Sequence, residues 1–530
     1  MSQIVLHPGT PIKIAILAMG GQGGGVLADW TVEMAEAAGW WAQTTSVPGV
    51  AQRTGATIYY VELLPESAAQ AAGRPPALAM MPTPGDVDLV VAAELMEAGR
   101  AMQRGLVTPD RTTLITSTHR SYAVAEKAAP GNGIADPNKV IDAGREAAKR
   151  LLCFDLQQLA ERAGSVISAS LFGAIAGSGA LPFARDAFEE TIRHGGVGVE
   201  ASLRAFALGF EAAASAPAEP APINTSRALP DVPGHAADPR VQALLDDVRR
   251  FPTAAQPLLV AGVRRLIDYQ DVAYAQDYLR TLQGLRELDA KAGGDARDWA
   301  LTQAAARYVA VAMSYDDVIR VADLKTRGSR FERVRSEVGA KAGQLVYTTE
   351  FMHPRLEEIC GTLPAPLGRW LENSKAVGGF IRRRVEKGRR VQTGTLTWFL
   401  ALYGVAGMRR FRRATLRHRI ETAHLRDWLE RATRIAAADY ALGVEVLNCR
   451  RLIKGYSGTH DRGDKRFERL MSAADRLLGQ PDAAATLRGL REAALADEEG
   501  KALDAQLAQL LRGRAAAGSP QALDTRRVAA

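Results

Sequence analysis

The segment IKIAILAMGGQGGG, residues 12–25, gives the strongest indication of the fold. Its first part, Ile12–Met19, is a short and mostly apolar run, which is typical of a buried strand when turn residues follow it. The second part, Gly20-Gly21-Gln22-Gly23-Gly24-Gly25, allows the backbone to turn tightly. The pattern that follows predicts a helix from about Gly23 to Ala38, ended by Gly39.

The same alternation of apolar runs and helical patterns continues to residue 213. One such helical pattern is Glu94–Gln103. Strands that alternate with helices are typical of a mostly parallel sheet covered by helices. We therefore predict an α/β fold, with a Rossmann-like, doubly wound domain over residues 1–213. Its further strands are expected at Trp40–Thr45, Ala56–Leu63, Asp88–Ala92, Thr113–Ser117 and Leu151–Phe154.

Residues 214–237 are rich in proline, alanine and serine, a composition typical of a linker. Beyond them, the apolar residues from Val241 to Val248 fall at i, i+3, i+4 and i+7, which indicates an amphipathic helix. Similar patterns recur down the chain. We predict a mainly α-helical C-terminal domain over residues 238–515, followed by a disordered tail over residues 516–530.

The composition limits the classes of function. The net charge of +8 on 530 residues is modest and does not by itself indicate a nucleic-acid-binding protein. Cys153, Cys360 and Cys449 are too few and too far apart for a cysteine-ligated iron–sulfur cluster, and no histidine spacing suits a metal. Without an apolar stretch of about 18 residues, we expect no membrane span and a cytoplasmic protein.

The glycine run is suited to an anion. It opens a helix whose free N–H groups and positive dipole end would attract a phosphate. It is not a G-x-G-x-x-G motif, because Val26 occupies the third glycine position, and the acid that would hold a nicotinamide ribose is missing. A nicotinamide site is therefore disfavoured, and a tight turn without a ligand is the alternative.

The second candidate feature is the loop VPGVAQRTGA, residues 47–56, which is expected near the same edge of the sheet. Gln52 and Arg53 lie among its small residues, and an arginine fork there could bind a carboxylate or a phosphate. Taken alone, an arginine paired with a nearby acid is the simpler interpretation.

Together, these features resemble the gamma-type domain of the pyruvate/2-oxoacid:ferredoxin oxidoreductases. The glycine run is followed by the PGVAQRTGA loop, the strand IYYVEL, and the segments DVDLVVAAELMEAGRA and LVTPDRTTLITST. The family has a GGQG run, an RGG-like loop and a strand–helix with the pattern D-x-x-x-A-x-x-x-x-E-A. Here Asp88 through Glu97 and Ala98 carry that last pattern, and the resemblance covers residues 12–213.

Two positions depart from the family. Arg53-Thr54-Gly55 stands where many relatives have Arg-Gly-Gly, and Ser168-Ala169-Ser170 stands where many carry an asparagine, so no role is carried over from that asparagine. In the C-terminal half, MSYDDVIRVADLKTRGSRFERVR (313–335) and NCRRLIKGYSGTHDRG (448–463) resemble segments attached to the indolepyruvate branch. This resemblance points to the small, or beta, subunit of an arylpyruvate enzyme.

The resemblance implies a CoA-dependent oxidative decarboxylation of aryl 2-oxoacids such as indolepyruvate. The products would be an aryl-acetyl-CoA, CO2 and reduced ferredoxin. Because the gamma-type domain is associated with coenzyme A, Gly20–Gly25, Gln52 and Arg53 are expected to contact coenzyme A at a subunit interface. No catalytic residue is indicated, and no cofactor is expected on this chain alone.

The family's thiamine diphosphate site, a GDG motif followed by an asparagine, is missing from this sequence. Gly85-Asp86, Gly294-Asp295 and Gly463-Asp464 are each followed by a residue other than glycine. Thiamine diphosphate, Mg and [4Fe–4S] clusters are therefore expected on a large partner subunit, with two copies of each subunit in the complex and ferredoxin as the electron acceptor.

Two other classes of function remain open at this point. The basic helical half could bind nucleic acid or act as a scaffold, through the runs Arg382–Arg390 and Arg409–Arg413. A solvated helix face or a subunit contact is the favoured interpretation of both runs, and docking of acidic ferredoxin is another. A stand-alone nicotinamide oxidoreductase is the second class, disfavoured by the missing acid. A polar cluster that is predicted as a loop, either functional or purely structural, contains Lys454, Tyr456, His460, Asp461 and Arg462.

Overall fold

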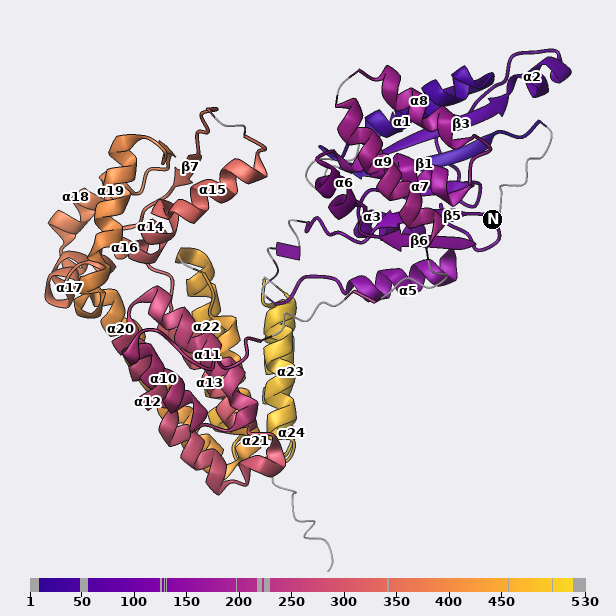
Figure 1. Ribbon diagram of the computed structural model, residues 1–530. Helices are drawn as coiled ribbons and strands as arrows, with labels where there is room; N and C mark the ends of the chain where they lie inside the picture. Colours follow the sequence, from indigo (N-terminus) through magenta and orange to yellow (C-terminus); the bar gives the residue numbers. More distant parts are fainter. Residues whose placement is uncertain are drawn as a thin grey trace, which may run out of the picture. The chain divides into compact units, whose positions relative to one another are not determined.

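The computed structural model divides into two compact units, Met1–Arg227 and Ala228–Ala530 (Figure 1). The division falls inside the Pro/Ala-rich stretch 214–237. The residues that the structure describes are 9–47, 56–123, 126–127, 129, 131–196, 198–216, 222–223, 229–340, 343–455, 457–497 and 499–517. The predicted tail 516–530 lies outside these residues, apart from 516 and 517, which end the last helix.

The first unit contains a six-stranded sheet in the order β2-β3-β1-β4-β5-β6. The ladders β1–β4, β4–β5 and β5–β6 are parallel, whereas β3 runs antiparallel to both β1 and β2. The mostly parallel α/β fold predicted from the sequence is thus confirmed. The strands are β1 (Ile12–Met19), β2 (Trp40–Val47), β3 (Ala56–Pro65), β4 (Leu89–Ala92), β5 (Thr113–Ser117) and β6 (Arg150–Phe154).

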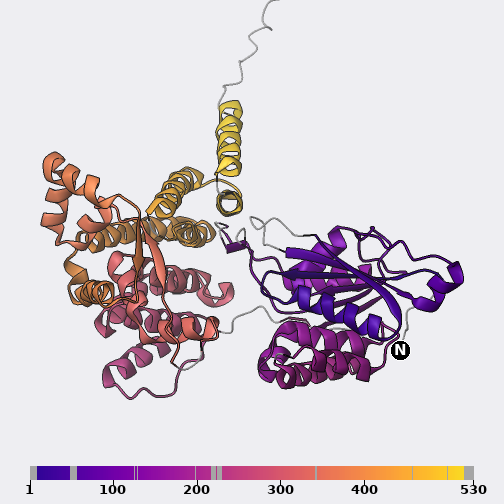
Figure 2. The same cartoon turned by 90° about the horizontal axis from the view of Figure 1, so that it is seen from above.

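Helices cover both faces of this sheet. Because side chains alternate along a strand, Ile14 and Ile16 of β1 enter one apolar core, and Ala15 and Leu17 enter the other. Figure 2 shows the magenta helices α7 to α9 as a layer on one side of the sheet. The helices of this unit are α1 (Gly24–Ala37), α2 (Glu66–Ala72), α3 (Leu95–Gln103), α5 (Pro137–Ala147), α6 (Leu156–Ala163), α7 (Ile167–Ser178), α8 (Arg185–His194) and α9 (Val199–Ala214).

Neighbouring strands β1 and β4 send their helices to opposite faces. Helix α1 packs Leu27 and Met34 into the first core, together with α7 and α8, whereas α3 packs Ala98 and Ala101 into the second. In open α/β sheets, a crevice opens at the carboxyl ends of such a strand pair, and ligands bind there. The turn Gly20–Gly25 and the residues after β4 therefore meet at this edge of the sheet.

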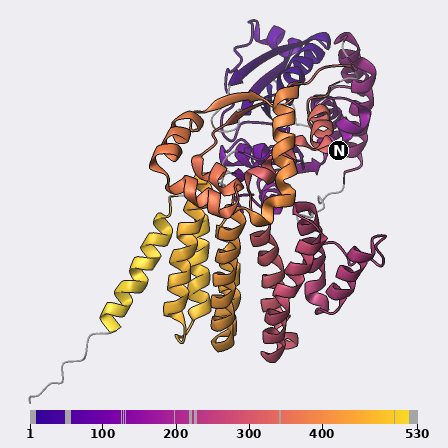
Figure 3. The same cartoon turned by 90° about the vertical axis from the view of Figure 1, so that its left-hand side faces the viewer.

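The second unit is mainly helical, as predicted, around a large apolar core (Figure 3). Its one departure among the described residues is a two-stranded antiparallel sheet of β7 (Thr349–Met352) and β8 (Arg389–Gln392). Both strands are four residues long and lie far apart in the chain, so neither leaves a clear alternating pattern in the sequence. No helix in the described part of the chain is long and apolar enough to cross a membrane.

The helices of the second unit are α10 (Pro239–Arg249), η2 (Thr253–Ala255), α11 (Gln256–Tyr269), α12 (Val272–Lys291), η3 (Gly294–Arg297), α13 (Ala300–Met313), α14 (Val318–Thr326), α15 (Gly328–Glu337), α16 (Leu356–Thr362), α17 (Ala365–Asn373), α18 (Lys375–Val385), α19 (Leu396–Gly407), η4 (Met408–Ala414), α20 (Leu416–Ala438), α21 (Tyr440–Asn448), η5 (Cys449–Leu452), α22 (Ser457–Leu477), α23 (Ala483–Ala496) and α24 (Lys501–Ala517).

Candidate functional site

The glycine run connects β1 to α1 through a turn that needs glycine at several positions. Gly21 and Gly23 have φ angles of 89° and 69°, which favour glycine. A Cβ atom on Gly24 would lie 2.6 Å from both Ala18 Cβ and Tyr59 Cε2. The backbone of the run is therefore held tightly against β1 and β3 where α1 begins.

The first turn of α1 is open to an anion. Its N-cap is Gly23 in the left-handed conformation, no side chain caps the turn, and no acidic residue lies in it. The first backbone N–H groups of a helix have no partner within the helix and carry the positive end of its dipole. A phosphate or carboxylate could accept from these groups without competing with a side chain.

Gln22 holds the turn in place. Its Oε1 accepts a hydrogen bond from Met19 N at 2.8 Å, and its backbone N donates to Met19 O at 3.1 Å. With Oε1 used as an acceptor, the Nε2 amide donates toward His119 Nε2 at 3.4 Å. This arrangement places the proton of a neutral His119 on Nδ1, which lies 3.0 Å from Ser117 Oγ.

Ser117 extends this chain of hydrogen bonds to the next strand end. Its Oγ accepts from Leu156 N at 3.1 Å, at the start of α6. The links from Gln22 through His119 and Ser117 thus join the carboxyl ends of β1, β5 and β6. No motif in the sequence indicates His119 or Ser117 as site residues, although both lie directly at the end of a predicted strand.

We expect the stability of this unit to fall in acid because of His119. Burial lowers the pKa of its imidazole below the usual value of about 6.5, and the carboxylates of Asp155 and Glu161 oppose the shift only in part. The folded state therefore favours the neutral ring. The stabilisation is fully present above about pH 6.5 and is lost as the pH falls through the lower folded-state pKa.

The measurement is urea unfolding between pH 5 and 8, compared with His119→Asn, which keeps a hydrogen-bonding side chain but does not titrate. We expect the variant to lose less stability than the wild type as the pH falls below about 6.5. If the free energy of unfolding changes with pH to the same extent in both proteins, protonation of His119 is not the cause of the loss of stability in acid.

Two buried acids follow β4 at the same edge. Glu94 and Glu97 are each 1% exposed, and burial raises the pKa of both carboxyl groups. Glu94 Oε2 accepts from Ser121 N at 3.4 Å, and Glu97 Oε1 lies 3.4 Å from Arg100 Nη2. Because burial disfavours the charged form of both carboxyl groups, this pair is a candidate for holding or delivering a proton at this edge of the sheet.

Ser168, on α7, faces the glycine run from the other side. Its Oγ would lie 2.9 Å from a Cβ atom on Gly23, and it is buried without a hydrogen-bond partner among the described residues. Ser170 instead donates to the carbonyl of Leu156 at 2.8 Å. The position where this sequence departs from the family's asparagine therefore contacts the candidate site, and that departure was the sequence signal for it.

The structure thus places Gly20–Gly25 at the carboxyl edge of the sheet, but Gln52 and Arg53 lie outside the described residues. The family-like pattern from Asp88 to Glu97 spans the sheet. Asp88 binds Lys13 N at 2.9 Å and Arg111 Nε at 2.7 Å just before β4, and Glu97 lies beyond its other end.

Residues 13–212 match the model of the pyruvate ferredoxin/flavodoxin oxidoreductase family. This match lies within the first unit, Met1–Arg227. Residues 255–473 of the helical unit match a second family model, which is described as a family of unknown function (DUF6537). A comparison with curated proteins gives no match.

Solved structures similar to this chain carry related descriptions. A pyruvate oxidoreductase subunit of Thermotoga maritima is 18% identical, with a TM-score of 0.28, over 38% of this chain and 96% of that chain. The gamma subunit of a keto/oxoacid ferredoxin oxidoreductase of Geobacter sulfurreducens is 16% identical, with a TM-score of 0.26, over 38% and 98%. The 2-oxoglutarate:ferredoxin oxidoreductase of Magnetococcus marinus is 14% identical, with a TM-score of 0.29, over 40% and only 33%.

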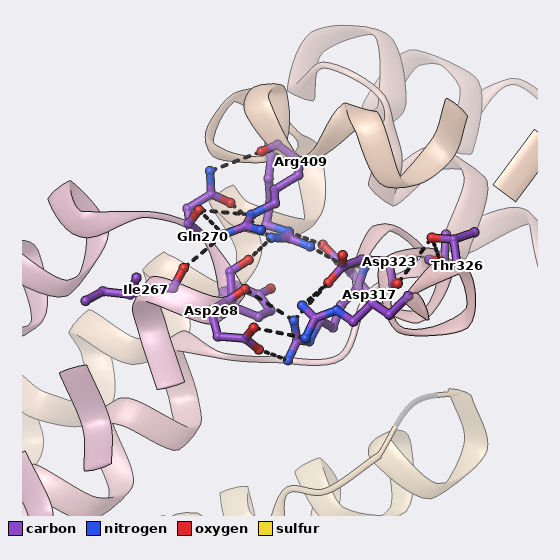
Figure 4. A network of polar contacts seen from close by, with 12 residues as sticks. Ile267, Asp268, Gln270, Asp317, Asp323, Thr326 and Arg409 are labelled. Carbon is purple, nitrogen blue, oxygen red and sulfur yellow. Dashed lines mark hydrogen bonds and ion pairs between the residues drawn. The ribbon is translucent and has the colours of Figure 1, made fainter. Parts of the chain in front are cut away.

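In the second unit, the basic run Arg409–Arg413 is divided between the interior and the surface. Arg412 is buried and Arg409 half-buried, whereas Arg410 and Arg413 are exposed, as expected for a solvated face or subunit contact. Arg412 is 1% exposed and binds both carboxylate oxygens of Asp317, at 2.8 and 3.2 Å. Arg409 donates to the carbonyl oxygens of Ile267 and Gln270 at the end of α11 (Figure 4). These arginines tie α14 and η4 to α11, so they are not available to nucleic acid.

The same network includes part of the segment 313–335 that resembles the indolepyruvate branch. Arg320 and Arg327 each pair with Asp268 of α11, at 2.7 and 2.9 Å, and both also bind Asp323 (Figure 4). Several of the charges in this segment thus have a structural role.

The predicted polar loop around His460 is wrong in its secondary structure. His460, Asp461 and Arg462 lie in the first turns of α22, while Tyr456 is outside the described residues. His460 Nε2 lies 3.6 Å from Glu421 Oε1. Burial opposes ionisation of Glu421, but the hydrogen bond from His460 and the charges of Arg417 and Arg450 lower its pKa to about 2. Helix α22 begins at Ser457 and continues through Gly458 and Gly463.

Proposed function

We propose that this chain is the small subunit of an indolepyruvate-type, or arylpyruvate, 2-oxoacid:ferredoxin oxidoreductase. The observation that carries the proposal is the family match over residues 13–212, together with the glycine run at the carboxyl edge of its sheet. The segments 313–335 and 448–463, which resemble the indolepyruvate branch, support the aryl substrate.

The proposed reaction converts one aryl 2-oxoacid anion, one coenzyme A thiol and two oxidised ferredoxins. The products are one aryl-acetyl-CoA, one CO2, two reduced ferredoxins and one proton. The bond between the carboxylate and the keto carbon breaks, and a thioester bond forms at that carbon. The two electrons released pass to ferredoxin one at a time.

We assign Gly20, Gly21, Gln22, Gly23, Gly24, Gly25, Gln52 and Arg53 to coenzyme A at a subunit interface. The open first turn of α1 suits one of its phosphates, since no side chain and no acid occupies that turn. Gln22 would keep the turn in register, and the Arg53 guanidinium would add a charge-assisted fork. The buried Ser168 hydroxyl, without a partner among the described residues, is a further polar group beside this turn.

The rest of the machinery belongs to a partner in this proposal. Three separate cysteines and no GDG motif leave this sequence without the ligands for a [4Fe–4S] cluster or magnesium–thiamine diphosphate. Thiamine diphosphate supplies the electron sink for decarboxylation when bound, and it would lie on the large subunit with the clusters. We propose two copies of each subunit, located in the cytoplasm.

The proposed domain organisation follows the sequence boundaries. Residues 1–213 form the gamma-type domain, 214–237 the linker, 238–515 the helical domain and 516–530 the tail. Truncation of the full chain at the linker would test whether the oxidoreductase domain remains folded without the helical one.

The function is tested with the complex purified from cells that produce this chain at its natural level. Indolepyruvate or phenylpyruvate, coenzyme A, thiamine diphosphate and a viologen dye are added. We expect dye reduction that requires coenzyme A and an iron–sulfur partner. A colourless protein that never reduces the dye with either aryl 2-oxoacid would contradict the proposal.

In that assay, Arg53→Ala is expected to raise the KM for coenzyme A about tenfold or more, because a lost charge-assisted contact costs about 1.5–3 kcal/mol. The KM for the aryl 2-oxoacid should change little. Arg111→Ala, which removes an arginine before β5 that binds Asp88, is the control for a general loss of charge or stability. Unchanged coenzyme A dependence would remove Arg53 from the site.

A further inference from the structure

Helix α19 has an unusual composition for an exposed helix. Its sequence, LTWFLALYGVAG, contains no charged residue, yet no residue of this helix is buried. Leu396, Leu400 and Tyr403 are 74%, 55% and 62% exposed. A helix that is apolar all round is normally covered on every side. Something outside the described part of this chain is therefore expected to cover α19.

The exposed side of α19 has the shape of a helix-packing surface. At about 100° per residue, Leu396, Leu400 and Tyr403 fall on one stripe, and the small residue Gly404 lies beside it. Another side of α19 packs on α14. Phe399, beside this stripe, stacks on Tyr403 with ring centroids 6.0 Å apart and contacts Phe331 of α15 with ring centroids 6.1 Å apart. Large side chains next to small ones form the ridges and grooves that a neighbouring helix fits.

The surrounding lobe, residues 318–411, exposes many more large hydrophobic side chains than the rest of the unit does. Fifteen large hydrophobic side chains of the lobe are exposed. By contrast, Leu229 and Ile420 are the only exposed large hydrophobic side chains among those that the structure describes in the rest of the unit. Clustered exposure of this kind marks an interaction surface rather than the scattered apolar surface of any protein.

Positive charge is concentrated in the same lobe. Residues 365–411 contain ten Lys or Arg and two Glu, a net charge of +8 that equals the net charge of the whole chain. Arg383, Arg384, Arg389 and Arg390 are exposed. A partner that covers α19 must therefore combine an apolar centre with a rim of carboxylates.

We propose that α19 is the helix through which this chain docks on the thiamine-bearing large subunit. This inference rests on the proposed function for the identity of the partner. The contact surface of that subunit would be an apolar groove with acidic edges, and α19 would lie in it along its Leu396–Tyr403 stripe. Trp370 of α17 and Phe380 of α18, each 57% exposed, would extend the contact.

A second copy of this chain and a lipid surface fit α19 less well than the large subunit does. A second copy of this chain, related by a twofold axis, would bring the same cationic rim against itself, which is unfavourable. A lipid surface favours a helix with lysine or arginine on its own polar face, and α19 has neither. The short β7–β8 sheet of this lobe also offers unpaired strand edges, which a protein can satisfy but a hydrocarbon layer cannot.

The available area is sufficient for a stable interface. A buried aromatic side chain contributes roughly 150–250 Å². Trp370, Phe380 and Tyr403, at about 60% exposure, together with Leu396 and Leu400, would supply several hundred square ångströms of apolar contact. One partner in a standard interface contributes roughly 800 Å², so these side chains could form its apolar core.

Hydrogen exchange of the full-length chain, alone and in the purified complex, tests the docking directly. We expect amide exchange in peptides covering residues 396–407 to slow at least tenfold in the complex. We also expect the double substitution Leu400→Asp with Tyr403→Asp to raise the Kd of the two subunits by about 100-fold or more. The reason is that it places two carboxylates at an apolar contact with acidic edges.

Val338→Asp is the matched control, because Val338 is 61% exposed and lies in the same lobe but outside α19. It should leave the dissociation constant unchanged. Leu400→Ala, which adds no charge, should weaken the complex by about tenfold, and thermal unfolding of each isolated variant shows whether the chain is folded.

The outcomes separate this inference from the proposed function. In one outcome, the complex reduces the dye while amide exchange in α19 is the same as in the isolated chain and the double variant binds as tightly as the wild type. That result overturns the docking site alone. Protection of α19 by a partner in a complex that never reduces the dye overturns the thiamine-bearing partner and the proposed function together. If the isolated chain forms a dimer that the double variant abolishes, the partner of α19 is a second copy rather than the large subunit. If the chain binds phosphatidylserine vesicles and the double variant does not, the partner is a membrane.

Discussion

Replacing Arg412 with alanine is expected to lower the free energy of unfolding of the helical unit by about 3–5 kcal/mol. The Arg412 guanidinium is 1% exposed and binds both Asp317 oxygens, the carbonyl of Tyr269 at 2.7 Å and Gln270 Oε1 at 3.0 Å. Its removal leaves the Asp317 carboxylate buried without its counter-charge, and water cannot replace the lost contacts without entering the packed region.

Arg413→Ala provides the control one residue away. Arg413 pairs with Asp277 at 2.5 Å, but its side chain is 48% exposed, so its loss should cost less than about 1 kcal/mol. Urea unfolding, followed by hydrogen exchange of peptides from the helical unit, measures both. Equal losses for the two variants would mean that the Arg412–Asp317 pair is as well solvated as a surface pair.

Gly173→Ala should be the most damaging single substitution in the first unit, with a loss in the free energy of unfolding of about 3 kcal/mol or more. A Cβ atom there would lie 2.0 Å from Phe206 O, so the backbones of α7 and α9 would have to separate. A Cβ atom on Gly177 or on Gly209 would lie just as close to the facing helix, 2.3 Å from Phe210 O and 2.1 Å from Ser170 O. Separation would also move Ser168, on α7, away from the glycine run.

The control is Gly99→Ala, in the interior of α3. A Cβ atom there would meet Val140 Cγ1 at an ordinary 3.5 Å. Since alanine favours a helix over glycine by about 1 kcal/mol, this variant should be as stable as the wild type or slightly more so. The two substitutions make the same chemical change, so opposite signs in urea unfolding would isolate the helix contact. A stable Gly173→Ala protein would show that α7 and α9 have room to move.

The two units differ in how their charges relate to function. In the first unit, polar groups gather at the carboxyl edge of the sheet, where Gln22 contacts His119 and Glu94 accepts from Ser121 N. In the helical unit, the acids and arginines of the segment 313–335 mostly bind each other and the end of α11. A basic run in a sequence is therefore a weak indicator of a binding surface until its partners are known.

The sequence by itself determined the local elements of the first unit. Ile12–Met19 and Thr113–Ser117 were predicted with the ends that the structure has, and the other strands differ by a few residues. It also determined the change to a helical second half. These features follow from periodicity and from glycine, which act over neighbouring residues and leave a direct trace in the order of amino acids.

Only the tertiary structure decided which distant residues meet. Gln22 and His119 are 97 residues apart, and Arg412 and Asp317 are 95 apart. The sequence showed that Arg409 to Arg413 are basic, but a 3₁₀ turn directs Arg412 inward, where Asp317 neutralises it. Whether a charge is buried or exposed depends on the packing of elements far apart in the chain, and local periodicity carries no record of that packing.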